Sequence, residues 1–258
     1  MVDPPTHPNP YRTRAFGPAD HGLMIPAGHV VLWIGILLLL APIALLMQSI
    51  VLSLWSPTLA SHGTIVTEVL MSAALIAGMF LVGLSRHYNW ERFGFWMPVR
   101  TDYLFVGGIL AISIFIQPLF MFGFDAEGAT DLRDTFFTAY HPQGVLLFEL
   151  LVFAALVILA PLLEEMVFRG LFFGWARQRL GFFEAALFSS LIFAAFHAHY
   201  VDALGLHWGF RALAMIFTLG FLSALLFERT GSLIAPTLLH GLFNLQAAIP
   251  LLLDIPPA

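Results

Sequence analysis

Residues 150–169 read LLVFAALVILAPLLEEMVFR, a run of apolar side chains that meets its first charges only at Glu164 and Glu165. About 20 apolar residues are enough to cross the hydrocarbon core of a bilayer, so this run predicts a transmembrane helix. Arg169 follows one helical turn after Glu165. Ionisable side chains at membrane depth are costly and rare, and those that occur face the interior of a helix bundle and mark functional sites. The stretch therefore predicts part of a site inside the membrane.

Two later apolar runs carry polar residues in a similar way. One ends in Phe193-x-x-x-His197, and the other contains His240-x-x-x-Asn244. Pro236 lies one turn before His240, where a proline can start or bend a helix. Residues four apart share a helix face, so His240 and Asn244 can present an imidazole and an amide to the same point. With the glutamates of the first run, these side chains form a set that can activate a water molecule.

The composition indicates a membrane protein. Hydrophobic residues make up 59% of the 258 residues, charged residues only 10%, and the mean hydropathy is +0.87. This balance is typical of a polytopic helical membrane protein and not of a soluble domain. The chain contains no Cys, which excludes a cysteine nucleophile, disulfides and thiolate metal ligands.

The apolar runs predict an all-α fold, a polytopic transmembrane helical bundle of about seven to eight spans with its N-terminus in the cytoplasm. Nine of the eleven arginines fall on one side of the spans and only Arg133 and Arg211 on the other, and the basic side faces the cytoplasm. We expect residues 1–27 to be a disordered cytosolic leader and residues 28–258 to be the bundle, with a catalytic core at about 145–250. The expected spans are about 28–53, 64–85, 103–123, 145–168, 182–200, 211–228 and 232–252.

The first two clusters can be placed relative to each other. Leu180-Gly181 is typical of a helix end followed by a turn, which predicts an antiparallel hairpin centred there. Glu164 and His197 each lie about 16 residues, or ~24 Å of helix, from that turn, so they are expected at the same depth. His240 lies only about nine residues beyond the turn at Thr230-Gly231. On straight helices at 1.5 Å rise per residue it would be shallower than Glu164, unless the long hairpin projects into the cytoplasm, and the sequence leaves this choice open.

Residue spacing also predicts which glutamate of the first cluster pairs with Arg169. Glu165 and Arg169 are four apart and can form an ion pair, which makes each charge tolerable in a low-dielectric site. Glu164 is rotated by about 100° from Glu165 and is left free for chemistry. In the alternative interpretation, both glutamates contact Arg169 or interfacial water at a helix end.

These groups suggest a hydrolytic mechanism. Glu164 can act as general base on a water that His197 orients, while His240 and Asn244 donate hydrogen bonds to a carbonyl oxygen that develops negative charge. Glu164, His197 and His240 can also hold a divalent metal such as zinc, although no His-Glu-x-x-His motif is present. The sequence leaves the choice between these two mechanisms open.

Each polar residue also has a simpler interpretation. A histidine near a helix end, such as His197, often reaches for the membrane interface. His240 and Asn244 can instead join two helices by hydrogen bonds. Interfacial or structural roles are expected for four further residues, namely Glu68, Glu149, His199 and His207.

The ordered set Glu164-Glu165-x-x-x-Arg169, Phe193-x-x-x-His197 and His240-x-x-x-Asn244 resembles the CPBP family of CAAX prenyl proteases and bacteriocin-processing proteins, also called the ABI family. The resemblance covers roughly residues 145–250. It implies an intramembrane endopeptidase with Glu164 as the base, His197 as its assistant, and His240 and Asn244 as stabilisers of the oxyanion. Glu165, Arg169 and Phe193 would shape the site. Family members have been described both as metalloproteases and as metal-free glutamate enzymes, so the resemblance does not decide the cofactor.

The leading hypothesis is an endopeptidase that hydrolyses a membrane-associated or lipidated substrate, with no nucleic-acid partner. It is expected in the bacterial cytoplasmic (inner) membrane, with its active site open toward the cytoplasm. One alternative is a non-catalytic self-immunity or scaffold protein of the same family. A second is a proton-coupled transporter, although the inverted repeats of many transporters are not evident.

Overall fold

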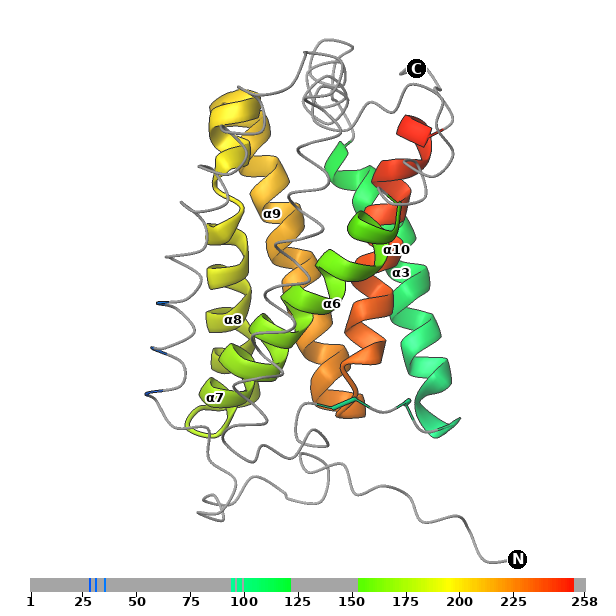
Figure 1. The fold of residues 1–258 in the computed structure, drawn as a ribbon, viewed down its shortest axis with the longest axis vertical. Helices are drawn as coiled ribbons and strands as arrows, with labels where there is room; N and C mark the ends of the chain where they lie inside the picture. The colour runs from blue at the N-terminus through cyan, green and yellow to red at the C-terminus, as the bar shows by residue number, and fades with distance from the viewer. Residues whose placement is uncertain are drawn as a thin grey trace, which may run out of the picture.

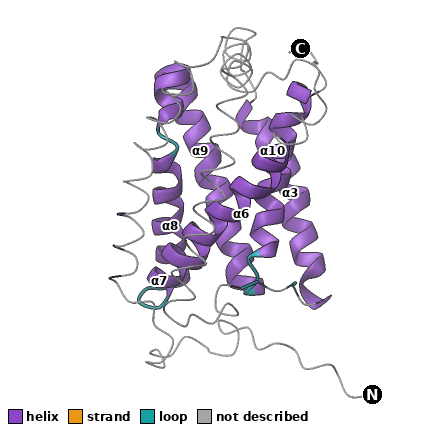
Figure 2. Ribbon diagram, viewed as in Figure 1, coloured by secondary structure: helices purple, strands orange, loops and turns teal. Residues whose placement is uncertain are grey.

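The computed structural model describes residues 100–121 and 153–252, together with Gly28, Val31, Gly35, Gly94, Phe95, Met97 and Pro98. Within this part of the chain all regular structure is helical, which confirms the all-α part of the predicted fold class (Figure 2). The expected leader and the expected spans at 28–53 and 64–85 lie outside the described residues, apart from three single positions.

The described helices are joined by short turns or follow one another directly. In chain order they are η2 (Arg100–Asp102), α3 (Tyr103–Met121), η3 (Ala155–Leu159), α6 (Ala160–Glu165), η4 (Met166–Phe173), α7 (Gly174–Arg177), α8 (Phe182–Phe196), α9 (His199–Thr230) and α10 (Ile234–Leu252). α10 begins two residues before Pro236, as the proline predicts.

The four elements from η3 to α7 form one continuous helix, because the residues at their junctions keep right-handed helical backbone angles. Two of them, η3 and η4, are π-helical. Pro161 lies in the first turn of α6 and cannot donate the hydrogen bond that would continue the ladder to Val157. A change of hydrogen-bond pattern is therefore expected here, and π-helical turns in other proteins occur frequently at functional sites.

This continuous helix crosses the bundle obliquely (Figure 1). Its first half, η3 and α6, packs against α10, and its second half, η4 and α7, packs against α8. α9 contacts α8, α10 and α3. The helix carrying the two glutamates therefore lies against both of the elements that carry the histidines.

The segment between the predicted spans 182–200 and 211–228 was expected to be a loop, and this expectation was wrong. α8 ends at Phe196, and α9 already begins at His199, so residues 201–210 are helical with a kink at Gly205 (φ 74°, ψ 171°). Only glycine adopts such backbone angles without strain.

One helix of the described part, Gly205–Thr230, is long and apolar enough to cross a membrane, with 26 residues and a mean hydropathy of 2.0. α8 has 15 residues, fewer than the roughly 20 needed to cross a bilayer alone. The number of spans, seven to eight, therefore stays a prediction.

The end of the bundle that holds the two hairpin turns is fixed by buried polar contacts. Arg177 Nε donates to Glu228 Oε2 at 3.1 Å, which joins the first hairpin to α9. At the second turn Gly231 has φ 64° and ends α9, as expected from Thr230-Gly231. Leu233 N donates to Gly94 O at 2.8 Å. These contacts fix the positions of α7, α9 and α10 relative to one another at this end of the bundle.

Candidate active site

Glu165 lies at the centre of a buried polar cluster. Its side chain is fully buried, and its two oxygens have different partners: Oε2 lies 3.1 Å from Arg169 Nε, and Oε1 lies 3.0 Å from His240 Nδ1. Arg169 is also fully buried and donates from Nη2 to Gly220 O at 2.9 Å. The predicted Glu165–Arg169 ion pair is confirmed, and the structure adds His240 to it.

Glu164 points away from this pair, as its rotation on the helix predicts. Its Oε2 lies 3.8 Å from Nε2 of His197 and 3.8 Å from Nε2 of His240. These distances are too long for direct hydrogen bonds, and separations of this kind are commonly bridged by water. Among the described residues Oε2 has no hydrogen-bond partner, although it is buried. The Glu164 and His197 side chains are 26% and 21% exposed, so the cluster can be reached from its surroundings.

The partners of the two imidazoles determine which nitrogens face Glu164. His197 Nδ1 lies 2.8 Å from the carbonyl oxygen of Phe193, which can only accept, so Nδ1 carries a hydrogen. The Glu165 carboxylate likewise accepts a hydrogen bond from His240 Nδ1, so that this Nδ1 also carries a hydrogen. Both rings are thereby held with Nε2 toward Glu164, where a neutral ring accepts a proton or a hydrogen bond and a charged ring donates one.

Phe193 packs against both histidines and the arginine of the cluster. Its ring centroid is 4.8 Å from that of His197 and 5.6 Å from that of His240. The guanidinium carbon of Arg169 lies 4.8 Å from the same centroid. Phe193 is 1% exposed, so its ring is a buried wall that fixes the two imidazole planes. The expected supporting role of Phe193 agrees with these contacts.

Asn244 lies one turn beyond His240 on α10, and its side chain forms a hydrogen bond with the π-helical turn η3. Asn244 Nδ2 donates to Leu156 O at 2.9 Å. An amide nitrogen carries two hydrogens, so one remains for another acceptor. Asn244 therefore anchors α10 to η3, whatever further contact it makes.

Gly241 makes the close approach of α10 to η3 sterically possible. A Cβ at this position would lie 2.5 Å from the backbone oxygen of Val157, a distance that real Cβ atoms essentially never show. Sequence reasoning missed Gly241, although its place directly after His240 was a usable signal. Gly220 lies against the cluster from α9, where its carbonyl oxygen accepts the hydrogen bond of Arg169 Nη2.

The structure tests the hairpin geometry directly. Glu164 and His197 were expected at the same depth, and they lie within 3.8 Å of each other. The depth of His240 was left open, and the structure places its Nε2 3.8 Å from Glu164 Oε2, as close as that of His197. The estimate assumed straight, parallel helices, whereas the helix that carries Glu164 runs obliquely (Figure 1), so its residues lie less deep than their count along the chain suggests.

Glu164, His197 and His240 have donor types suited to zinc, namely one carboxylate oxygen and two imidazole nitrogens. The second partners of the imidazoles, a carboxylate and a backbone carbonyl, are also those that orient histidine ligands in metal sites. As they stand, however, no group of three or more His, Asp or Glu in the described ranges is arranged to hold a metal ion. Zinc held by Glu164, His197 and His240 stays a prediction.

Comparison with known proteins supports the resemblance found in the sequence. Residues 146–246 match the family model described as Type II CAAX prenyl endopeptidase Rce1-like. A Bacillus subtilis protein named "Putative membrane peptidase YdiL" is 33% identical over 87 residues, which is 34% of this chain and 32% of that protein. An Escherichia coli protein named "Uncharacterized 24.3 kDa protein" is 36% identical over 93 residues, 35% of this chain and 40% of that protein.

The alignments thus span between about a third and two fifths of these relatives. No solved structure matches the chain. The predicted family resemblance is confirmed for residues 146–246, the part of the chain that contains all three polar clusters.

Proposed function

We propose that this chain, whose residues 146–246 belong to the Rce1-like family of membrane endopeptidases, is itself an intramembrane endopeptidase that acts by glutamate-activated water. The observation that carries the proposal is the position of Glu164 Oε2, 3.8 Å from Nε2 of both His197 and His240. One water molecule between these three atoms would be in reach of a base and of two imidazoles at once.

In the proposed reaction, Glu164 takes a proton from the water. The water oxygen attacks the carbonyl carbon of the scissile peptide bond at the same time. His197, with Nε2 facing Glu164, orients the water. The proton held by Glu164 then passes to the leaving amine as the carbon–nitrogen bond breaks. The first products are a carboxylic acid and an amine, which become a carboxylate and an ammonium when the acid's proton passes to the amine, and no further reactant is consumed.

The developing oxyanion needs hydrogen-bond donors on its other side. His240 Nε2 faces Glu164 and its Nδ1 is held by the Glu165 carboxylate, so a ring that also carries a hydrogen on Nε2 would donate from there. The second hydrogen of Asn244 Nδ2 is a further donor on the same helix face.

The location of the site supports a membrane-borne substrate. The continuous helix that carries Glu164 and the helix α8 that ends beside His197 both contact α9, which contains the membrane-capable helix Gly205–Thr230. We propose a membrane-anchored or lipidated peptide. The arginine distribution favours a site open to the cytoplasm of a bacterial cell.

The test is proteolysis by the purified full-length protein in lipid, against a library of membrane-anchored and lipidated peptides read by mass spectrometry. Glu164→Gln should abolish cleavage. Glu184→Gln, which changes an exposed glutamate in the first turn of α8, is the matched control and should cleave like wild type. Equal cleavage by wild type and Glu164→Gln would refute the mechanism. If no variant cleaves any peptide but expression protects cells from a bacteriocin, the non-catalytic immunity alternative takes its place.

A further inference from the structure

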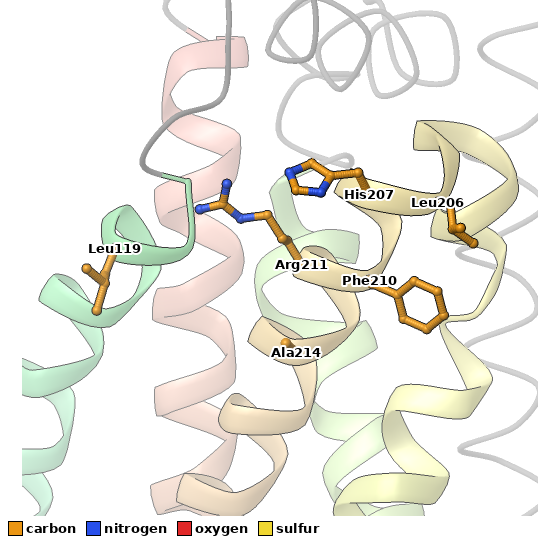
Figure 3. A pocket seen from close by; sticks show the side chains of 6 residues that line it. All are labelled: Leu119, Leu206, His207, Phe210, Arg211 and Ala214. Carbon is orange, nitrogen blue, oxygen red and sulfur yellow. The ribbon is translucent and has the colours of Figure 1, made fainter.

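A second site lies at the opposite end of α9 from the hairpin turns. Here an open groove of about 730 Å³ is lined by residues from the end of α3 and the kinked start of α9 (Figure 3). The lining residues are Leu119, Leu206, His207, Phe210, Arg211 and Ala214. The reaction proposed above uses none of them.

The polar part of the groove is basic. His207 and Arg211 are four residues apart and share a face of α9. Figure 3 shows Arg211 extending from α9 toward α3, where Leu119 lies, with His207 beside it. The guanidinium of Arg211 carries a fixed positive charge, and the ring of His207 offers an N–H donor beside it. Together they can bind an anion.

The rest of the groove is apolar and accessible. Leu119 is 70% exposed, Leu206 69% and Phe210 59%. Ala214 lies one helical turn beyond Arg211, toward the centre of the membrane-capable helix. An occupant that reaches from Arg211 to Ala214 and Leu119 must therefore carry an apolar portion below its charged group.

The position of Arg211 in the helix matches the border of the hydrocarbon core. Residues 212–227 contain no charged side chain, and the next charge is Glu228. Sixteen helical residues extend ~24 Å, close to the thickness of ~30 Å of the hydrocarbon core. Trp208 lies beside Arg211, with the guanidinium carbon 5.0 Å from its ring centroid, and tryptophan is enriched at membrane interfaces. His207 and Arg211 are thus at headgroup level and Ala214 is at acyl-chain level.

We propose that this groove binds an anionic phospholipid, with its headgroup phosphate at Arg211 and His207 and an acyl chain along Leu119 and Ala214. Basic pockets between membrane helices bind acidic headgroups in this way. The volume of the groove, the positive charge of Arg211 and the order of polar and apolar residues along α9 all fit this occupant.

The experiment measures lipid binding to the purified full-length protein in neutral detergent. Phosphatidylglycerol and phosphatidylcholine with identical chains are titrated, and retained lipid is measured by native mass spectrometry. Wild type should retain phosphatidylglycerol in preference to phosphatidylcholine. Arg211→Gln should weaken phosphatidylglycerol binding about fivefold, the effect of one arginine near an anionic headgroup. Arg211→Lys keeps the charge and should bind within about twofold of wild type, because the compact ammonium still binds phosphate as a point charge.

The control is Arg100→Gln, which removes an exposed arginine before α3. It should leave phosphatidylglycerol binding unchanged. Equal weakening by Arg100→Gln and Arg211→Gln would show a general effect of net charge and overturn the proposal, as would unchanged binding by a folded Arg211→Gln. Displacement of the lipid by equimolar inorganic phosphate would also overturn it, since the groove would then take a free phosphate.

Discussion

Glu165 Oε1 and His240 Nδ1 are joined by a hydrogen bond of 3.0 Å, although 75 positions separate the two residues in the chain. The same carboxylate pairs with Arg169 through its other oxygen. One buried side chain therefore connects the arginine on its own helix to the imidazole on α10. In the proposed reaction Glu165 is a positioning residue, because its described contacts would reach the water and the substrate only through His240.

The first prediction concerns this pair of contacts. Glu165→Gln leaves the Arg169 guanidinium buried without its counter-charge, and breaking a buried ion pair in this way costs about 3–5 kcal/mol. The unfolding free energy in mixed micelles should fall by that amount. The double variant Glu165→Gln with Arg169→Gln should lose less than the sum of the two single variants. Losses that add would show that the two charges do not interact.

The catalytic consequence of Glu165→Gln separates positioning from stability alone. Because a neutral amide no longer holds His240 Nδ1 as the carboxylate does, kcat should fall while KM changes little. A stable variant with an unchanged kcat would leave Glu165 with a structural role only. Glu184→Gln is the matched control and should shift neither quantity.

The second prediction uses the close contact between α10 and η3. Gly241→Ala places a Cβ 2.5 Å from Val157 O, a backbone atom that cannot rotate away. α10 must move, and His240 is the adjacent residue. We expect a loss of about 1–3 kcal/mol in stability from overpacking, together with a larger loss of kcat than of substrate affinity.

The control for Gly241→Ala is Gly107→Ala on α3, where an added Cβ meets nothing within 4 Å. That change should alter stability by no more than about 0.5 kcal/mol. Wild-type activity in Gly241→Ala would mean that the position of His240 does not depend on the contact between α10 and η3.

These contacts show which parts of the site could be predicted from the sequence. The Glu165–Arg169 pair follows from a spacing of four on one helix, and the Glu164–His197 pair follows from counting residues back from one turn. Both depend on a single helix or a single hairpin, whose geometry is nearly fixed by the chain itself. The fold class could be predicted for the same reason, because apolar runs of this length are helical in a membrane.

The position of His240 could not be obtained by counting. It depends on how three helices cross, and the oblique path of the helix from η3 to α7 is set by packing between residues far apart in the chain. The hydrogen bond from Asn244 to Leu156 O has the same origin. The π-helical turns were also missed, although Pro161 gave a signal for them at a known position.

The third prediction tests the anchoring role of Asn244. Asn244→Asp retains the shape of the side chain but removes its donor, so that a carboxylate faces the Leu156 carbonyl oxygen. Leaving a partly buried carbonyl without its donor should cost about 1–3 kcal/mol. Loss of the oxyanion contact should also lower kcat by about 10²–10³-fold.

Thr237→Val is the control for Asn244→Asp on the same helix. Thr237 Oγ1 donates to Leu233 O, four residues earlier in the chain, and does not join α10 to η3. Its loss should change stability only slightly and kcat not at all. If Asn244→Asp lowers stability but leaves kcat intact, Asn244 anchors the helix and takes no part in stabilising the oxyanion.

The fourth prediction concerns zinc. The 3.8 Å separations between Glu164 Oε2 and the two Nε2 atoms fit a bridging water without any movement of the helices. We therefore expect protein purified with a chelator to keep its proteolytic activity and to contain well under one zinc per chain by elemental analysis. The opposite result, one zinc per chain with activity that chelation removes and zinc restores, would establish a metal mechanism. His197→Ala would then have to abolish zinc binding, because a site left with one carboxylate and one imidazole has too few protein ligands for catalytic zinc.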